Sequence, residues 1–131
     1  MIHDEICTCE VCKLAKEKGF PQDVFGTCEM KSSCYLEDGR YYKDGCICPI
    51  EEAYTAPTQS LLQRWLREEK DIHISIDYQQ GVDEDYPSYD YSVYRWPINT
   101  EAFVQEAWKD GYPTYELALA DALKYALENL V

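Results

Sequence analysis

The seven cysteines of this 131-residue chain all lie within its first 48 residues. In a small chain, such a cluster forms disulfides, binds a metal, or supplies small apolar side chains to a core. An odd number leaves at least one cysteine outside any set of disulfide pairs, so we rank disulfides third among these uses. The cysteines are Cys7, Cys9, Cys12, Cys28, Cys34, Cys46 and Cys48.

Acidic residues outnumber basic ones by 25 to 12, which gives a formal net charge of −13. This charge repels polyanions, so we expect neither direct nucleic-acid binding through phosphates nor attraction to an anionic membrane. Residues 1–6 lack the basic and apolar regions of a signal peptide, and the chain has no apolar run of about 18 residues. We therefore expect a cytoplasmic protein with reduced thiols and no membrane partner.

Four helices are predicted from the spacing of apolar residues and from capping residues. The third is expected to begin at Asn99 or Thr100 and to bury Phe103, Val104, Ala107 and Trp108. The four predicted helices span residues 9–19, 57–70, 99–111 and 114–130.

Two longer strands are predicted at residues 72–78 and 89–96, because their apolar and polar side chains alternate. We expect the two strands to pair antiparallel across an acidic, turn-rich loop. The prediction is one α+β domain over 1–131, with helices packed on small antiparallel sheets or hairpins. Its parts are a cysteine-rich helix plus hairpin at 1–50 and a helix-strand-strand-helix-helix part at 56–131.

A hairpin is predicted at residues 34–43, because Asp38-Gly39 is a preferred two-residue turn. This turn places Tyr35 opposite Tyr42. A second Asp-Gly pair would turn the chain into a further strand at 46–48. One face of that meander would then carry Cys34, Cys46 and Cys48.

Zinc is the metal that this cysteine pattern would suit, because intracellular structural zinc sites use paired thiolates. Cys9 and Cys12 form one C-x-x-C pair, and Cys46 and Cys48 form a tighter pair. Cys28 and Cys34 could replace members of these pairs as zinc ligands. The pattern also fits reduced thiols that pack as small apolar side chains, so no cofactor is favoured.

No catalytic signature is present in the sequence. A cysteine nucleophile needs a base, and nothing places His3 or His73, the only histidines, beside a thiol. The chain also lacks the glycine-rich phosphate loops and the nucleophile elbow of well-known enzyme classes. We do not expect an enzyme.

Three stretches of the chain carry a family likeness, namely CKLAKEKGF (12–20), APTQSLLQRWLREEKDIHISI (56–76) and TYELALADALKYALENL (114–130). They resemble a family of small proteins from gut Bacteroidales bacteria, their prophages and related mobile elements. In that family a lysine-rich first helix precedes variable tyrosine-rich hairpins, and a PTQ…WLRE helix leads into an IH-I strand. The resemblance implies one compact intracellular domain, but the family has no established activity, cofactor or catalytic residue. The cysteine cluster and residues 97–110 depart from the family pattern.

The acidic, tyrosine-rich hairpin formed by the two longer strands and their connecting loop is the candidate interaction site. Its candidate residues are Tyr86, Tyr89, Tyr91, Asp83 and Asp85. The first hypothesis is a non-enzymatic accessory or protein-interaction domain of phage or mobile-element origin, with an unknown protein partner. The alternatives are an acidic, phosphate-mimicking inhibitor of a nucleic-acid-binding protein and a small zinc-stabilised module. A homodimer is also left open by the tyrosine content and by exposed sheet edges.

Overall fold

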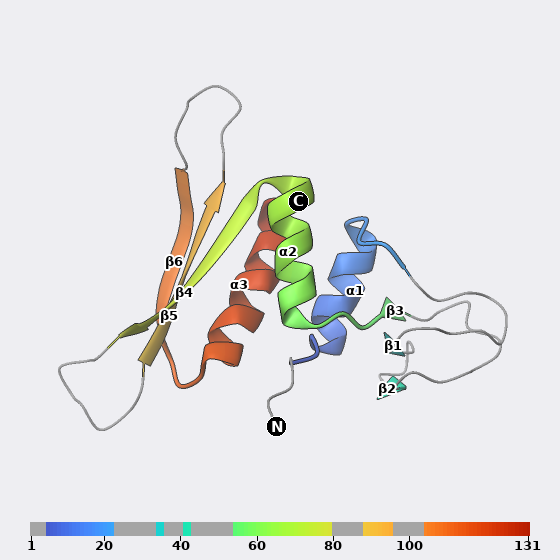
Figure 1. The fold of residues 1–131 in the computed structure, drawn as a ribbon, viewed down its shortest axis with the longest axis horizontal. Coiled ribbons are helices and arrows are strands. Elements are labelled where there is room, and N and C mark those ends of the chain that lie inside the picture. Colours follow the sequence, from blue (N-terminus) through green and yellow to red (C-terminus); the bar gives the residue numbers. More distant parts are fainter. Residues whose placement is uncertain (1–4, 23–33, 36–40, 43–53, 80–87, 96–103) are drawn as a thin grey trace, which may run out of the picture. The chain divides into compact units, whose positions relative to one another are not determined.

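The computed structural model describes residues 5–22, 34–35, 41–42, 54–79, 88–95 and 104–131. These residues form three helices and two small antiparallel sheets, which confirms the α+β fold class. The elements belong to two compact units, unit 1 at Met1–Thr58 and unit 2 at Gln59–Val131 (Figure 1). The expectation of a single domain stays a prediction.

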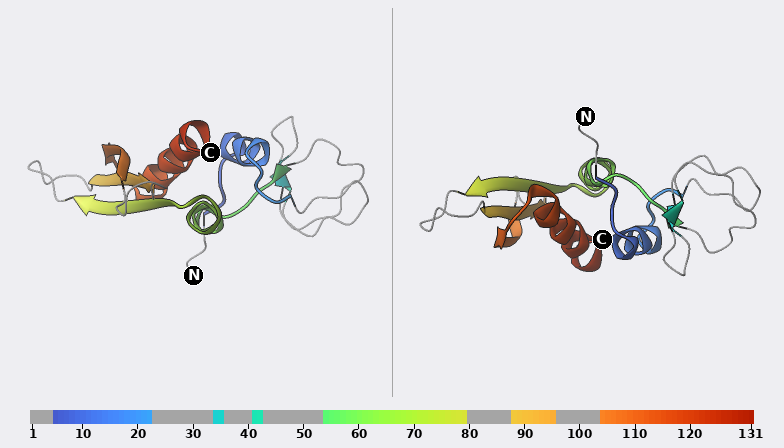
Figure 2. Two further views of the ribbon diagram at one scale, coloured as in Figure 1. Left: turned by 90° about the horizontal axis from the view of Figure 1, so that it is seen from above. Right: turned by 90° about the horizontal axis from the view of Figure 1, so that it is seen from below.

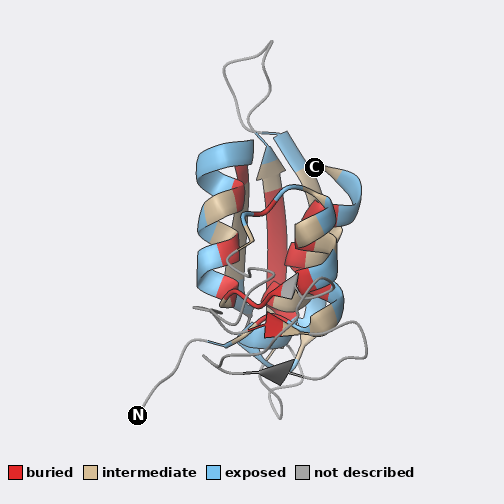
Figure 3. Cartoon of the chain, turned by 90° about the vertical axis from the view of Figure 1, so that its right-hand side faces the viewer, coloured by how far each residue is buried: buried red, intermediate tan, exposed pale blue. Residues whose placement is uncertain are grey.

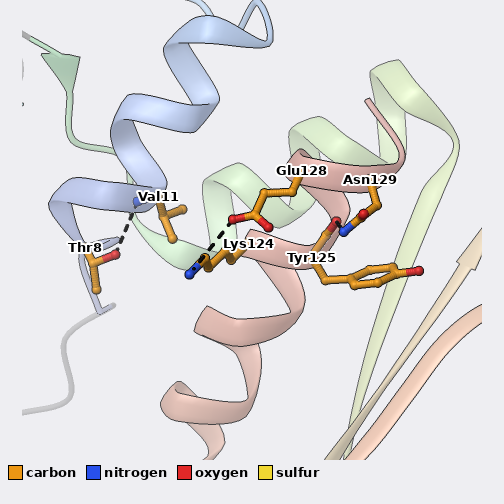
Figure 4. Close-up of polar contacts among 6 residues, drawn as sticks. All are labelled: Thr8, Val11, Lys124, Tyr125, Glu128 and Asn129. Atoms are coloured by element: carbon orange, nitrogen blue, oxygen red, sulfur yellow. Dashed lines mark hydrogen bonds and ion pairs between the residues drawn. The ribbon is translucent and has the colours of Figure 1, made fainter.

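Unit 1 contains helix α1 (Cys9–Glu17), which agrees with the predicted helix at 9–19. The Thr8 side chain caps the helix by accepting a hydrogen bond from the Val11 amide at 3.3 Å (Figure 4). The chain leaves the helix through Gly19, whose φ of 96° is a left-handed conformation that glycine adopts without strain. Apolar burial on the inner face of α1 comes from Val11, Cys12 and Ala15.

The small sheet of unit 1 has the strand order β2-β1-β3. Strand β1 (Cys34–Tyr35) pairs with β2 (Tyr41–Tyr42), so the predicted hairpin is present. Its register is corrected by one residue, because Tyr35 faces Tyr41 and not Tyr42. The observed register places Tyr42 opposite Cys34, and a shift of one residue changes which side chains share a face. The predicted turn at Asp38-Gly39 lies outside the described residues. The other edge of β1 pairs with β3 (Tyr54–Thr55), while the predicted strand at 46–48 lies outside the described residues.

Unit 2 contains five elements in the order helix, strand, strand, strand, helix. The three strands form one antiparallel sheet in the order β4-β5-β6, and α2 and α3 lie on the same face of it (Figures 1 and 3). The two views of Figure 2 give the same arrangement. The bounds are α2 Gln59–Lys70, β4 Ile72–Gln79, β5 Ser88–Arg95, β6 Val104–Tyr112 and α3 Tyr115–Asn129.

The core of unit 2 lies between this sheet face and the two helices. Asp71, with a φ of 54°, turns the chain directly from α2 into β4. Thr114 caps α3 by accepting a hydrogen bond from the Leu117 amide at 3.1 Å. At the other end of α3, Lys124 pairs with Glu128, and the Asn129 side chain donates to the Tyr125 carbonyl (Figure 4). The largest fully buried side chains of unit 2 are Leu62, Leu66, Ile72, Val93, Leu123 and Leu127.

The predicted helix at 99–111 is wrong, because residues 104–112 form strand β6. The first five residues of the predicted helix lie outside the described residues. The spacing of Val104, Ala107 and Trp108 suits a helix, but these residues pair along β5. The central strand β5 is buried on both faces at residues 90–93, so its outward backbone groups need a second neighbouring strand. Pairing with β6 satisfies these groups, and the order of unit 2 is therefore helix-strand-strand-strand-helix.

Helix side chains also hold the two outer strands. The Gln63 side chain of α2 donates to the Ile74 carbonyl of β4 at 3.0 Å, and the Tyr125 hydroxyl of α3 donates to the Glu106 carbonyl of β6 at 3.3 Å. Each of these hydrogen bonds joins a helix side chain to the backbone of an outer strand. They also fix each helix against one outer strand.

A polar cluster joins β6 to α3. The Tyr112 hydroxyl donates a hydrogen bond to the Asp121 carboxylate, which also pairs with Lys109 Nζ at 3.6 Å. Burial, followed by the hydrogen bond to Asp121, raises the pKa of Tyr112 above its ordinary value. The cluster therefore contributes contacts that only the strand conformation of residues 104–112 provides.

Tyr112→Phe is expected to lower the free energy of unfolding of unit 2 by about 1 kcal/mol, because it removes this hydrogen bond and keeps the ring. Urea unfolding followed by tryptophan fluorescence measures the change. Tyr78→Phe is the matched control, since the Tyr78 side chain is 60% exposed, and it should leave stability unchanged. Equal midpoints for Tyr112→Phe and the wild type would contradict the assigned role.

Candidate interaction surfaces

Among the described residues of unit 2, both helices lie on one face of the sheet, and we call the other face the helix-free face. The register places its side chains in cross-strand rows, because Ser75 faces Ser92 and Ser92 faces Trp108. Alternation along each strand then defines the whole face. It comprises His73, Ser75, Asp77, Asp90, Ser92, Tyr94, Gln105 and Trp108.

The most acidic part of the sheet is a row of three aspartates, one from each strand. Asp77 of β4 lies directly opposite Asp90 of β5. Lys109 faces Tyr91 and Tyr112 faces Tyr89, so Asp110 and Gly111 lie together opposite Asp90 at a bulge of β6. Asp90 is buried, whereas Asp77 and Asp110 are exposed. We call these three residues the aspartate row.

Asp77→Asn is expected to stabilise unit 2 by roughly 0.2–1 kcal/mol, because like charges directly opposite each other on paired strands repel. The Ser75 hydroxyl, which donates to Asp77 Oδ2 at 3.4 Å, can donate to the asparagine oxygen in the same way. The measurement is the urea midpoint at low ionic strength. The gain should shrink in high salt, and a lower midpoint for the variant would show that the repulsion is not the governing effect.

Trp108 is the large aromatic residue at the centre of the outer strand on the helix-free face. Its side chain is 55% exposed and lies opposite Ser92. The Ser92 hydroxyl accepts a hydrogen bond from Gln105 Nε2 at 3.4 Å. The sequence assigned Trp108 to the buried side of a helix, and its exposure follows from the strand conformation.

A second surface lies where β4 ends and where β5 and α3 begin, and we call it the tyrosine end. The Tyr78 and Tyr89 rings meet edge to face with centroids 5.4 Å apart, and the Tyr89 and Tyr115 rings do so at 6.4 Å. Tyr78 and Tyr115 are exposed, and Tyr89 between them is half-buried. Each ring is therefore held by a neighbour while its outer side stays accessible.

The predicted interaction residues are distributed unevenly. Tyr89 belongs to the tyrosine end, whereas Tyr86, Asp83 and Asp85 lie outside the described residues. Tyr91 needs a correction, because it is only 5% exposed and its ring lies 5.9 Å from that of Tyr112. Burial, with a smaller effect of the Asp121 charge, raises the pKa of Tyr91. Tyr91 thus supports the sheet from its helix-covered face.

The candidate metal ligands lie in unit 1. Cys7, Cys12 and Cys34 are buried as free thiols, and Cys9 is half-buried. Burial raises the pKa of Cys7 to about 12 and also raises the pKa values of Cys12 and Cys34. In the part of the chain that the structure describes, no three side chains of metal-ligand type form a group that could hold an ion. Cys28, Cys46 and Cys48 lie outside that part, so the zinc hypothesis stays a prediction.

Comparisons of this chain with protein-family models, curated proteins and solved structures found no match. Among the described residues, no helix is both long and apolar enough to cross a membrane.

Proposed function

We propose that this chain is a non-enzymatic protein-interaction domain of phage or mobile-element origin that works in the cytoplasm and binds a partner protein through the tyrosine end. The contacts among Tyr78, Tyr89 and Tyr115 carry this proposal. Exposed aromatic rings that neighbours already hold in place bring large contact areas at a low entropic cost, and such rings are enriched in protein interfaces. The origin rests on the sequence resemblance.

The partner that suits this surface presents arginines. The chain has a net charge of −13, which favours a basic partner. An arginine side chain can stack on an exposed tyrosine ring. Complementary charge would also speed the encounter of the two proteins.

The test compares variants at matched exposed positions. The full chain, Tyr78→Ser and Val104→Ser each serve as bait in a lysate of a gut Bacteroidales species, and each candidate partner is then purified. Val104 is an exposed apolar residue at the start of β6, away from the tyrosine end. Calorimetry with the purified partner should show at least tenfold weaker binding for Tyr78→Ser and unchanged binding for Val104→Ser. Equal affinities for both variants would refute the tyrosine end as the binding surface.

The aspartate row favours a second candidate function, a phosphate-mimicking inhibitor of a nucleic-acid-binding protein. Carboxylates fixed on neighbouring strands could occupy a site that normally holds phosphates. Binding by the aspartate row should weaken at least tenfold when salt rises from about 0.05 M to about 0.5 M, because charge attraction is screened. Binding by the tyrosine end should lose less affinity, because salt screens the long-range charge attraction but not the stacking on the tyrosine rings.

Charge removal separates the two candidates at constant salt. The double variant Asp77→Asn and Asp110→Asn should abolish inhibition of a nucleic-acid-binding partner if the aspartate row is the mimic. The same variant should retain most of its affinity if the tyrosine rings dominate the interface. Each result selects one function, and circular dichroism of the variant confirms that the fold is intact.

A further inference from the structure

The first turn of α1 carries two cysteines in different surroundings. Thr8 is the N-cap, so Cys9 is the first helical residue and Cys12 is the fourth. Cys9 is half-buried and Cys12 is fully buried. A reagent from solution can therefore reach Cys9, while burial shields Cys12 from direct attack.

We infer that Cys9 and Cys12 form a redox-active dithiol that exchanges with small-molecule disulfides. In an α-helix, Cα atoms three residues apart are about 5 Å from each other. This separation lies within the range of roughly 4.4–6.8 Å seen across disulfides. The spacing and the unequal exposure together assign separate roles, with Cys9 as the attacking thiol and Cys12 as the resolving thiol.

The exchange has two steps. The Cys9 thiolate attacks one sulfur of the small disulfide, so an S–S bond forms between them and one small thiolate leaves and takes a proton from water. The Cys12 thiol then gives up its proton and attacks the Cys9 sulfur, which closes the Cys9–Cys12 disulfide and releases the second small thiol. The protein loses two electrons, and the small disulfide gains them.

Formation of this disulfide should alter the first turn of α1. Cβ atoms three residues apart on a helix are about 5–6 Å from each other, whereas a disulfide needs roughly 3.5–4.5 Å. The turn must therefore tighten, which changes two hydrogen bonds to Thr8. The Val11 amide donates to the Thr8 side chain, and the Cys12 amide donates to the Thr8 carbonyl at 2.9 Å. The oxidation state of the pair is thereby coupled to the start of the helix.

Cys7 is the competing partner in this cluster. The Cys12 thiol donates to the Cys7 carbonyl at 3.7 Å, which shows that the two residues are neighbours. Cys7 and Cys12 are both fully buried, so burial does not decide which of the two thiols attacks the mixed disulfide on Cys9. The helical spacing assigns this role to Cys12, because Cys7 lies before the helix. The inference therefore requires that Cys7 stay reduced when Cys9 and Cys12 are oxidised.

The experiment oxidises the reduced full chain with glutathione disulfide, blocks the remaining thiols with N-ethylmaleimide and maps the peptides by mass spectrometry. Residues 1–13 form one tryptic peptide, because Lys13 follows Cys12, and Glu10 offers a cleavage site between the two cysteines. The expected peptide has lost two hydrogens and carries one maleimide on Cys7. A maleimide on Cys9 or Cys12, a disulfide to another cysteine, or no oxidation would each refute the inference.

Variants test the two roles. Cys12→Ser should trap glutathione on Cys9, Cys9→Ser should abolish the exchange, and Cys7→Ala should leave its rate within about twofold of wild type. If Cys12→Ser fails to fold, the wild-type peptide map and Cys9→Ser still test whether Cys9 and Cys12 form the disulfide. Elemental analysis of the same sample is included, because stoichiometric zinc that blocks the exchange would also overturn the inference.

Discussion

Leu123→Ala is expected to lower the free energy of unfolding of unit 2 by about 2–5 kcal/mol. Leu123 of α3 has 0% exposure and belongs to the core between the helices and the sheet. The substitution removes buried apolar surface and leaves a cavity that the surrounding strands can only partly fill. A loss of this size is a large part of the stability of a small domain.

Tryptophan fluorescence in urea isolates this effect, because all three tryptophans, Trp65, Trp96 and Trp108, belong to unit 2. Leu117→Ala is the matched control, since it is the same substitution in the same helix at a residue that is 52% exposed. The control should change stability by less than about 0.5 kcal/mol. Equal losses for the two variants would contradict the assigned core.

The elements that the sequence predicted well are those in which local pattern and tertiary packing agree. Strand β4 alternates isoleucine with polar residues, and it pairs with β5 in the expected antiparallel manner. Helix α3 agrees with the predicted helix at 114–130, begins after its Thr114 cap and buries leucine and alanine side chains along one face. The α+β class followed from such elements, because each apolar face needs a partner layer.

Strand β6 shows where local pattern is insufficient. Val104, Ala107 and Trp108 fit a helical spacing, and nothing in their own segment reveals that β5 needs a neighbour on this side. The strand also contains two register irregularities, one of them beside Gly111 with a φ of 89°. Such bulges break the strict alternation by which strands are recognised. Because the segment was predicted as a helix, the sequence did not predict that Trp108 is exposed or that Asp110 lies beside Asp90.

The sequence predicted which residue types form the candidate surfaces, but not which individual residues are exposed there. Tyrosines and aspartates near residues 77–94 were expected to form an interaction site, and Tyr89 does lie at an accessible surface. Which tyrosines are exposed depends on the position of α3, which buries Tyr91 and brings Tyr115 to Tyr89. A contact between residues this far apart in the chain produces no recognisable pattern in the sequence around either residue.

Alkaline pH is expected to destabilise unit 1 through its buried thiols. Desolvation raises the pKa of Cys7 from 9.0 to about 12, and it raises the pKa of Cys12 as well. A pKa that is higher in the folded state means that the folded chain holds the proton more tightly than the unfolded chain. The stability is therefore full below pH 9, and each such thiol removes about 1.4 kcal/mol per pH unit between its unfolded and folded pKa values.

Pulsed alkylation of Cys12 during urea unfolding measures this loss in unit 1, because all seven cysteines lie before residue 59. A phosphine keeps the thiols reduced, and labelling in full denaturant at each pH corrects for reagent reactivity. Cys7→Ala starts from a lower stability, since it removes a buried sulfur, but its decline above pH 9 should be shallower by about 1.4 kcal/mol per pH unit. Parallel declines for the variant and the wild type would show that the Cys7 thiol does not remain protonated in the folded protein, and would remove the basis for treating it as a core side chain.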